Sequence, residues 1–110
     1  KTRVCIVGAS KGYPGDYSRV KGKRIYGLEE AMAVPGVTVY GAGIRMEDGN
    51  FYANGGRLFS VVGEGDNIIH AQERARDVME RISVEGDNLY WRNDIGLRDI
   101  GRYRKAISIS

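Results

Sequence analysis

The run Asn54-Gly55-Gly56-Arg57-Leu58-Phe59-Ser60-Val61-Val62 joins a glycine turn directly to a strand-like stretch. The two glycines lack Cβ atoms, so a ligand or another backbone can approach them closely. Arg57 stands at the junction and adds a planar cation that suits a phosphate or a carboxylate. An ordinary turn before a strand has the same composition, so this run alone leaves both a structural turn and a ligand-facing site open.

Apolar, β-branched stretches on either side of this run predict further short strands. Arg3–Ala9 is too short for a stable helix and predicts a largely buried strand, and Val37–Ala42 predicts a second. The second strand is expected to continue through Gly43–Glu47 to a hairpin turn at Asp48-Gly49, because Asp-Gly pairs tolerate the positive φ angles of tight hairpins. With Arg57–Gly63 as the third clear strand, the order predicts consecutive antiparallel strands.

The strongest helical pattern begins at Asp66, which is predicted to be the N-cap. The helix is expected to end near Ser83. Leu28–Ala33 predicts about one more helical turn, and Arg24–Tyr26 a short extended piece. Apolar residues recur at helical spacing along one face of the main helix: Ile68, Ala71, Ala75, Val78, Met79 and Ile82.

Length and composition limit the class of protein. A chain of 110 residues is enough for one small domain, residues 1–110, and the order of elements predicts the α+β class: a small, mostly antiparallel or barrel-like sheet with one long helix in the C-terminal half. The formal net charge of +3 fits a nucleotide or sugar phosphate as partner, but is too mild to indicate nucleic-acid binding. No apolar run approaches the roughly 20 residues that span a membrane. The single cysteine, Cys5, excludes an intrachain disulfide, is expected to be a buried core thiol, and fits a reducing cytoplasm.

Standard nucleotide and metal motifs do not match this sequence. A Walker loop ending at Gly22-Lys23 would need a glycine and a hydroxyl residue where the chain has Tyr17 and Arg24. One histidine, His70, and one cysteine cannot form a zinc set, so no metal ligand is predicted and His70 is expected at the helix surface or boundary. No pair of carboxylates has a spacing that indicates acid–base chemistry, so no catalytic residue is predicted.

Two further segments present polar groups between glycines. Gly12-Tyr13-Pro14-Gly15 lies in the expected loop Ser10–Lys23, and Arg92-Asn93-Asp94-Ile95-Gly96 follows the only tryptophan. Rigid glycine turns that present arginine suit an anionic ligand at the edge of a domain. Both segments also admit a structural interpretation, in which the tyrosines cover the end of a sheet and the arginine and aspartate pair with each other.

Taken together, the motifs resemble the C-terminal domain of the phosphoribosylamine–glycine ligases, purine-biosynthesis enzymes of the ATP-grasp superfamily. The resemblance covers most of the chain and rests on the order and spacing of these segments: Gly12–Tyr17, Gly22–Ala31, Pro35–Gly43, Asn54–Val62 and Arg92–Gly96. It implies a fold of the rudiment single hybrid type. The chain departs from the family pattern at Gly41-Ala42-Gly43-Ile44, where the family usually has His-Ala-Gly-Thr, so any role of that histidine or threonine is absent.

The resemblance implies an ATP-dependent carboxylate–amine ligase that joins glycine to 5-phosphoribosylamine in de novo purine biosynthesis and releases ADP and phosphate. ATP and Mg²⁺ (or Mn²⁺) would be bound mainly by other domains of the enzyme, so no cofactor is expected on this chain alone. The partners implied are those remaining domains and the two substrates, with neither nucleic acid nor membrane, in the cytoplasm. This domain would close the substrate cleft and be inactive in isolation.

The resemblance also implies a set of site residues. Arg57 would neutralise the 5′-phosphate of the substrate or orient the sugar. The cleft would be lined or braced by Arg92, Asp94 and Gly96. The substrate-binding residues would come from the glycine turn and the Tyr-Pro-Gly loop: Asn54, Gly55, Gly56, Arg57, Tyr13, Pro14 and Gly15.

A small, basic, non-enzymatic binding module for RNA or a protein is the alternative. Its motive is the basic C-terminal segment, residues 98–105, together with Tyr90, Trp91 and Tyr103. Aromatic rings beside arginines can stack on single-stranded nucleic acid. The near balance of acidic and basic residues speaks against this interpretation.

Overall fold

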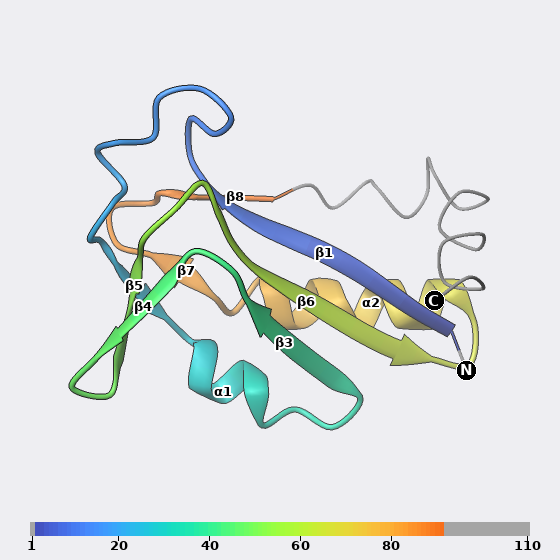
Figure 1. Ribbon diagram of the computed structural model, residues 1–110. Coiled ribbons are helices and arrows are strands. Elements are labelled where there is room, and N and C mark those ends of the chain that lie inside the picture. The colour runs from blue at the N-terminus through green and yellow to red at the C-terminus, as the bar shows by residue number, and fades with distance from the viewer. Residues whose placement is uncertain (1, 92–110) are drawn as a thin grey trace.

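Two antiparallel sheets and two helices form residues 2–91, the part of the chain that the computed structural model describes (Figure 1). One sheet has the strand order β3-β6-β1-β8 and the other β4-β5-β2-β7. The α+β class expected from the sequence is therefore confirmed. The elements in chain order are β1 (Thr2–Ser10), β2 (Arg24–Tyr26), α1 (Leu28–Met32), β3 (Val37–Gly41), β4 (Ile44–Glu47), β5 (Asn50–Ala53), β6 (Arg57–Gly65), α2 (Ile68–Met79), β7 (Ser83–Val84) and β8 (Leu89–Tyr90).

The longest strands, β1 and β6, pair along nearly their whole length. Thr2 lies opposite Gly65, and the register runs without interruption to Gly8 opposite Phe59. A shift between Gly8 and Ala9 then places Ala9 opposite Arg57. Such an irregularity bends the strand locally and re-aims the residues that follow it. It occurs where β1 enters the loop that leads to β2.

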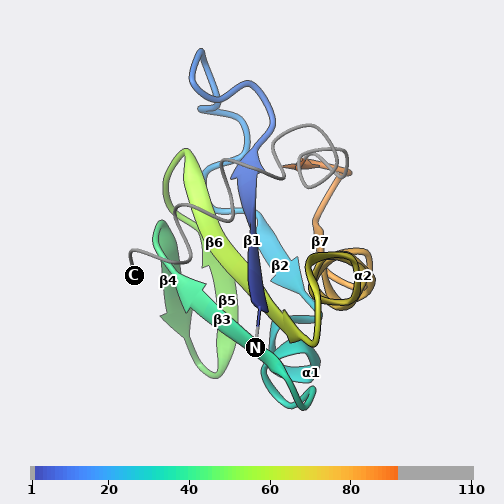
Figure 2. The same cartoon turned by 90° about the vertical axis from the view of Figure 1, so that its right-hand side faces the viewer.

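Helix α2 runs along β1 and β6 in Figure 1 and is seen along its axis in Figure 2. Glycines on β6 allow the two backbones to touch: a Cβ atom on Gly63 would overlap the carbonyl oxygen of Ala71 and lie 2.7 Å from the nitrogen of Ala75. A Cβ on Gly65 would likewise lie 2.7 Å from the nitrogen of Ala71. The predicted apolar face of the helix is confirmed, because all six of its residues are buried.

The helix is shorter than its sequence pattern predicts, and its N-cap is Asn67 instead of Asp66. Asn67 has extended backbone angles, and its side chain accepts a hydrogen bond of 2.9 Å from the His70 amide. The helix ends at Met79, four residues before the predicted end at Ser83. There the chain leaves the helix because Ser83 and its neighbour pair with β2 as strand β7.

The prediction of consecutive antiparallel strands is wrong where the chain changes sheet, between β3 and β4 and again between β5 and β6. β3 pairs with β6 in the first sheet, and β4 pairs with β5 in the second, so the expected continuous strand from Val37 to Glu47 is divided. The division falls at Ala42-Gly43, whose amides donate to the carbonyls of Leu58 and Arg57. The Asp48-Gly49 hairpin is confirmed, with φ angles of 52° and 81°.

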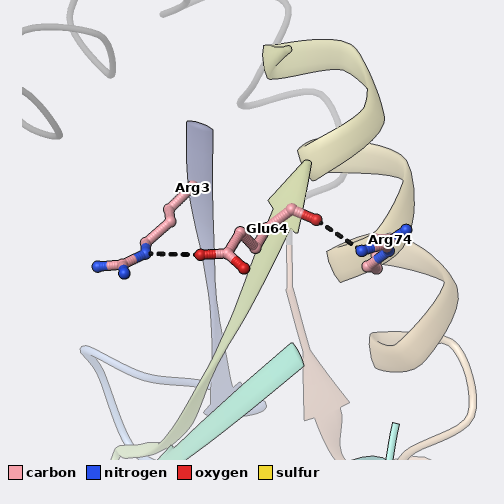
Figure 3. Close-up of polar contacts among 3 residues, drawn as sticks. All are labelled: Arg3, Glu64 and Arg74. Carbon is pink, nitrogen blue, oxygen red and sulfur yellow. Dashed lines mark hydrogen bonds and ion pairs between the residues drawn. The ribbon is translucent and has the colours of Figure 1, made fainter. Parts of the chain in front are cut away.

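Glu64, near the C-terminal end of β6, connects this strand with β1 and α2 (Figure 3). Its carboxylate lies 3.4 Å from Nε of Arg3 on β1, and its carbonyl accepts a 2.9 Å hydrogen bond from Arg74 on α2. The Arg74 guanidinium also occupies the space where a Cβ on Gly36 would lie. Because the Arg3 and Glu64 side chains remain in contact with solvent, their ion pair adds little stability.

Cys5 is half-buried, which corrects the expectation of a core thiol. Its neighbours Val4 and Ile6 are buried, and alternation along β1 turns Cys5 to the opposite face of the sheet. Burial raises the pKa of the thiol, and a hydrogen bond with Ser60 opposes this in part. Of the helices in residues 2–91, neither has the length and apolar character that a membrane span needs.

The observed cap predicts different effects for two neighbouring substitutions. Asn67→Ala removes the acceptor for the His70 amide and is expected to lower the free energy of unfolding by about 1 kcal/mol. Asp66→Ala is the matched control, with an expected change within about 0.5 kcal/mol. Urea unfolding followed by circular dichroism measures both. A larger loss for Asp66→Ala than for Asn67→Ala would contradict the cap assignment.

Candidate functional site

The glycine turn Asn54–Gly56 carries the chain from one sheet to the other. It leaves β5 in the second sheet and enters β6 in the first. The Ala42-Gly43 corner crosses between the same sheets and packs on this turn: the Asn54 amide donates to the Gly43 carbonyl at 2.7 Å, and the Gly43 amide to the Arg57 carbonyl at 2.9 Å. A Cβ on Gly43 would lie 2.9 Å from the Cα of Gly55. The two crossings are therefore in backbone contact, which only glycine permits.

The Tyr-Pro-Gly loop lies against the same turn, at the edge where β1 ends and β6 begins (Figure 1). The Tyr13 ring covers Gly56, where a Cβ atom would overlap the ring. Tyr13 also makes an edge-to-face contact with Tyr17, with ring centroids 5.9 Å apart. The peptide bond between Tyr13 and Pro14 is cis. The structure thus brings together the two segments predicted to face a substrate.

Ser10 is a site residue that the sequence analysis missed. It is fully buried at the end of β1, its Oγ donates to the Gly55 carbonyl at 2.7 Å, and its amide donates to the Gly56 carbonyl at 2.7 Å. The available signal was a hydroxyl residue at the end of the apolar run Arg3–Ala9, directly before a glycine loop. Buried hydroxyl groups require a hydrogen-bond partner, so such a residue indicates a tertiary contact.

The side chains of Asn54 and Arg57 are exposed at this edge. Within residues 2–91, the Arg57 guanidinium has no ion-pair or hydrogen-bond partner. The Asn54 amide and the carbonyls of Gly55, Gly56 and Arg57 are thus hydrogen-bonded, while the guanidinium of Arg57 is exposed. A planar guanidinium in this setting can bind a phosphate or carboxylate through two parallel hydrogen bonds.

Basic residues also line a cavity beside the loop that contains the Tyr-Pro-Gly segment. Lys11, Arg19 and Lys23 line a shallow cavity of about 420 Å³ between the loop and the turn Gly86–Asn88. Lys11 is paired with Asp87 at 3.1 Å. Three basic side chains and one acidic side chain therefore line this cavity.

An Asx turn shapes the loop after Pro14. The Ser18 amide donates to Oδ1 of Asp16 at 3.0 Å. This bond, followed by a bond from the Ser18 hydroxyl and the charge of Arg19, holds the pKa of the Asp16 carboxyl below its ordinary value.

Arg92, Asp94 and Gly96 lie outside the described residues. His70 is exposed on α2, as expected. Within residues 2–91, no three histidine, cysteine or acidic side chains are close enough together to hold a metal ion, so none of these residues is assigned as a ligand.

This geometry defines the class of protein: an α+β domain of two antiparallel sheets. The turn and arginine of Asn54–Arg57 and the loop Tyr13–Gly15 form one edge of the domain, which we call the glycine edge. Residues 3–98 match the family model described as phosphoribosylglycinamide synthetase, C domain. The chain therefore belongs to this family of C domains.

Named relatives agree with the family. The chain is 46% identical over 95 residues to phosphoribosylamine–glycine ligase of Caldanaerobacter subterraneus, a match that covers 86% of this chain and 21% of the relative. It is 45% identical over 97 residues to the trifunctional purine biosynthetic protein adenosine-3 of Bos taurus, covering 88% of this chain and 9% of that protein. The crystal structure of phosphoribosylamine–glycine ligase from Thermotoga maritima superposes with a TM-score of 0.60 at 28% identity, covering 79% of this chain and 20% of that one. The chain thus spans about a fifth of the length of the ligases that it matches.

The contact between Tyr13 and Gly56 predicts that replacing Gly56 with alanine destabilises the fold, because the added methyl group would overlap the Tyr13 ring. Gly56→Ala is expected to displace the Tyr13 ring and to lower the free energy of unfolding by about 1–3 kcal/mol. Gly41→Ala is the matched control, because a Cβ there meets only an ordinary contact of 3.7 Å with Ile44. Thermal unfolding and the Tyr13 ring signals in NMR spectra report both effects. Equal stability of the two variants would show that Tyr13 does not cover Gly56.

The Asx turn predicts a pH dependence of the loop. Because the folded-state pKa of Asp16 is lowered, the turn contributes fully above the ordinary carboxyl pKa of about 3.9 and is lost as the pH falls through the folded-state value. An NMR titration of the Asp16 carboxyl and the Ser18 amide is expected to give a common midpoint below 3.9. Asp16→Asn keeps an acceptor and should abolish the transition at Ser18. A midpoint at or above the ordinary value is the contradicting result.

Proposed function

We propose that the chain, residues 1–110, is the single C-terminal domain of a phosphoribosylamine–glycine ligase, and that its glycine edge closes the cleft over the phosphoribosyl substrate. The observation that carries this proposal is the joint surface of Asn54–Arg57 and Tyr13–Gly15. Its backbone is fixed by hydrogen bonds and its arginine has no partner within residues 2–91. Membership of the C-domain family supports the assignment of the enzyme.

In the proposed reaction, ATP activates the carboxylate of glycine, and the amine of 5-phosphoribosylamine attacks it to give glycinamide ribonucleotide, ADP and phosphate. ATP and Mg²⁺ (or Mn²⁺) would be held by the remaining domains of the ligase. The described residues do not fit these groups, because they provide neither a cluster of metal ligands nor a phosphate-binding loop. The contribution of this chain is to bind and orient the sugar phosphate.

Arg57 is proposed to receive the 5′-phosphate. Its guanidinium is permanently charged, and a bidentate pair with a phosphate fixes both position and direction. Asn54 lies three residues before it on the same turn and offers an amide that can donate to a ribose hydroxyl or a phosphate oxygen. Tyr13 and Pro14 would form the wall beside them, because the Tyr13 ring already covers the turn.

The proposal also covers the macromolecular partners of the chain and its location in the cell. The remaining domains of the ligase are its macromolecular partners, and neither nucleic acid nor a membrane is required. We place the enzyme in the cytoplasm, a location that fits a chain with one cysteine and no intrachain disulfide.

The alternative of an RNA-binding module is less well supported. It needs Tyr90 and Trp91 as stacking platforms, but Trp91 is half-buried and packs against the core. Among the described residues of the C-terminal segment, only the ring of Tyr90, which is 49% exposed, is accessible for stacking on a base. Tyr103 lies outside the described residues.

The proposal predicts the effect of removing the guanidinium in the full-length enzyme. Arg57→Ala is expected to raise the KM for phosphoribosylamine by about 10- to 100-fold, since a charge-assisted contact to a phosphate is lost. The KM values for ATP and glycine should change little, and Arg57→Lys should recover part of the loss. Steady-state kinetics with each substrate varied in turn measures this.

Arg45→Ala is the control, because Arg45 is an exposed arginine on β4 that pairs with Glu47 at 3.8 Å. The assignment of Arg57 fails if Arg57→Ala leaves the KM for phosphoribosylamine within twofold of that of Arg45→Ala. The assignment of the enzyme fails if the unmodified full-length protein does not form glycinamide ribonucleotide.

A further inference from the structure

Within residues 2–91, Ser10 is the one residue whose hydrogen bonds join both segments of the proposed site. Its hydroxyl donates to the Gly55 carbonyl and its amide to the Gly56 carbonyl, each at 2.7 Å. Its own carbonyl accepts from the Tyr13 amide at 3.1 Å. All three polar groups of the residue are therefore used, and each bond reaches either the glycine turn or the Tyr-Pro-Gly loop.

The backbone of Ser10 is itself held by the neighbouring strand β8. Ser10 lies opposite Leu89 in the pairing of β1 with β8, and the next amide, that of Lys11, donates to the Asn88 carbonyl at 3.0 Å. The residue is fully buried. Loss of its hydroxyl would therefore leave the end of β1 and the Ser10 amide bond to Gly56 in place, and would remove only the bond that holds the Gly55 carbonyl.

The turn has no comparable apolar anchor, because its two central residues are glycines. Gly55 contributes only backbone contacts, and Gly56 is held under the Tyr13 ring. The hydroxyl of Ser10 is thus the only side-chain donor bonded to this turn within residues 2–91. A short bond from a buried hydroxyl to this carbonyl is directional and restricts the position of the turn.

We propose that Ser10 is a positioning residue that sets the placement of Asn54 and Arg57 relative to Tyr13 for binding of the phosphoribosyl substrate. This inference rests on the proposed function. Ser10 does not touch the substrate. It acts by holding the backbone from which the Arg57 guanidinium extends, so its hydroxyl affects the sugar-phosphate step selectively.

The test uses the full-length ligase with three variants. Ser10→Ala removes the hydroxyl, Ser10→Cys keeps a similar volume with a weak donor, and Ser83→Ala removes an exposed hydroxyl on β7 in the other sheet. The KM values for phosphoribosylamine, ATP and glycine are measured separately, and the thermal midpoint reports folding. Arg57→Ala is combined with Ser10→Ala in a double-mutant cycle.

For Ser10→Ala and Ser10→Cys, we expect a KM for phosphoribosylamine that is about tenfold higher, with unchanged KM values for ATP and glycine in the folded enzyme. The double variant should lose less than the sum of the two single variants, because the hydroxyl acts in part through that guanidinium. Ser83→Ala should match the unmodified enzyme.

A uniform loss of active protein with an unchanged KM would mean a purely structural role and would overturn the proposal, as would additive losses in the cycle. Should Ser10→Ala fail to fold, the same criteria apply to Ser10→Cys, which retains the packing volume. Failure of the proposed function is recognised separately, since the unmodified enzyme would then lack ligase activity.

Discussion

The close approach of α2 to β6 is the constraint on which the rest of the structure depends. Gly63 and Gly65 present no Cβ atoms, and Ala71 and Ala75 present small ones, so the helix lies directly on the strand. At this distance the helix covers the buried face of the long β1–β6 pair and closes the core. A larger residue at either glycine would lift the helix off the sheet, and the packing of every residue beneath it would change.

The edge proposed to face the substrate lies at the opposite end of the same strand pair, where backbone hydrogen bonds make most of the contacts. Two crossings between the sheets meet there, and glycines let them pack on each other. Carbonyl and amide groups, together with the Ser10 hydroxyl, hold this corner, while the side chains of Asn54 and Arg57 are exposed. A rigid backbone with an available guanidinium is preorganised for an anionic ligand, which lowers the entropic cost of binding.

The sequence predicted the features that depend on local patterns. Helical spacing identified the apolar face of α2, and the Asp48-Gly49 pair identified the hairpin, since both follow from backbone geometry within a few residues. The ordered motifs identified the family, and the family model agrees.

Features set by distant contacts were not predictable in this way. Asp66 and Asn67 are equally good caps by type, and only the path of the chain after β6 selects Asn67. The division of Val37–Glu47 into two strands depends on pairing with β6 and β5, which local alternation does not encode. Ser10 was missed because its partners lie 45 and 46 residues away.

A structure of the full-length enzyme with glycinamide ribonucleotide bound tests the central claim most directly. The account predicts that the Arg57 guanidinium lies about 3 Å from oxygens of the 5′-phosphate, with Tyr13 and Asn54 beside the sugar. A phosphate bound entirely by other domains, with Arg57 in solvent or paired to a carboxylate of the enzyme, would contradict it.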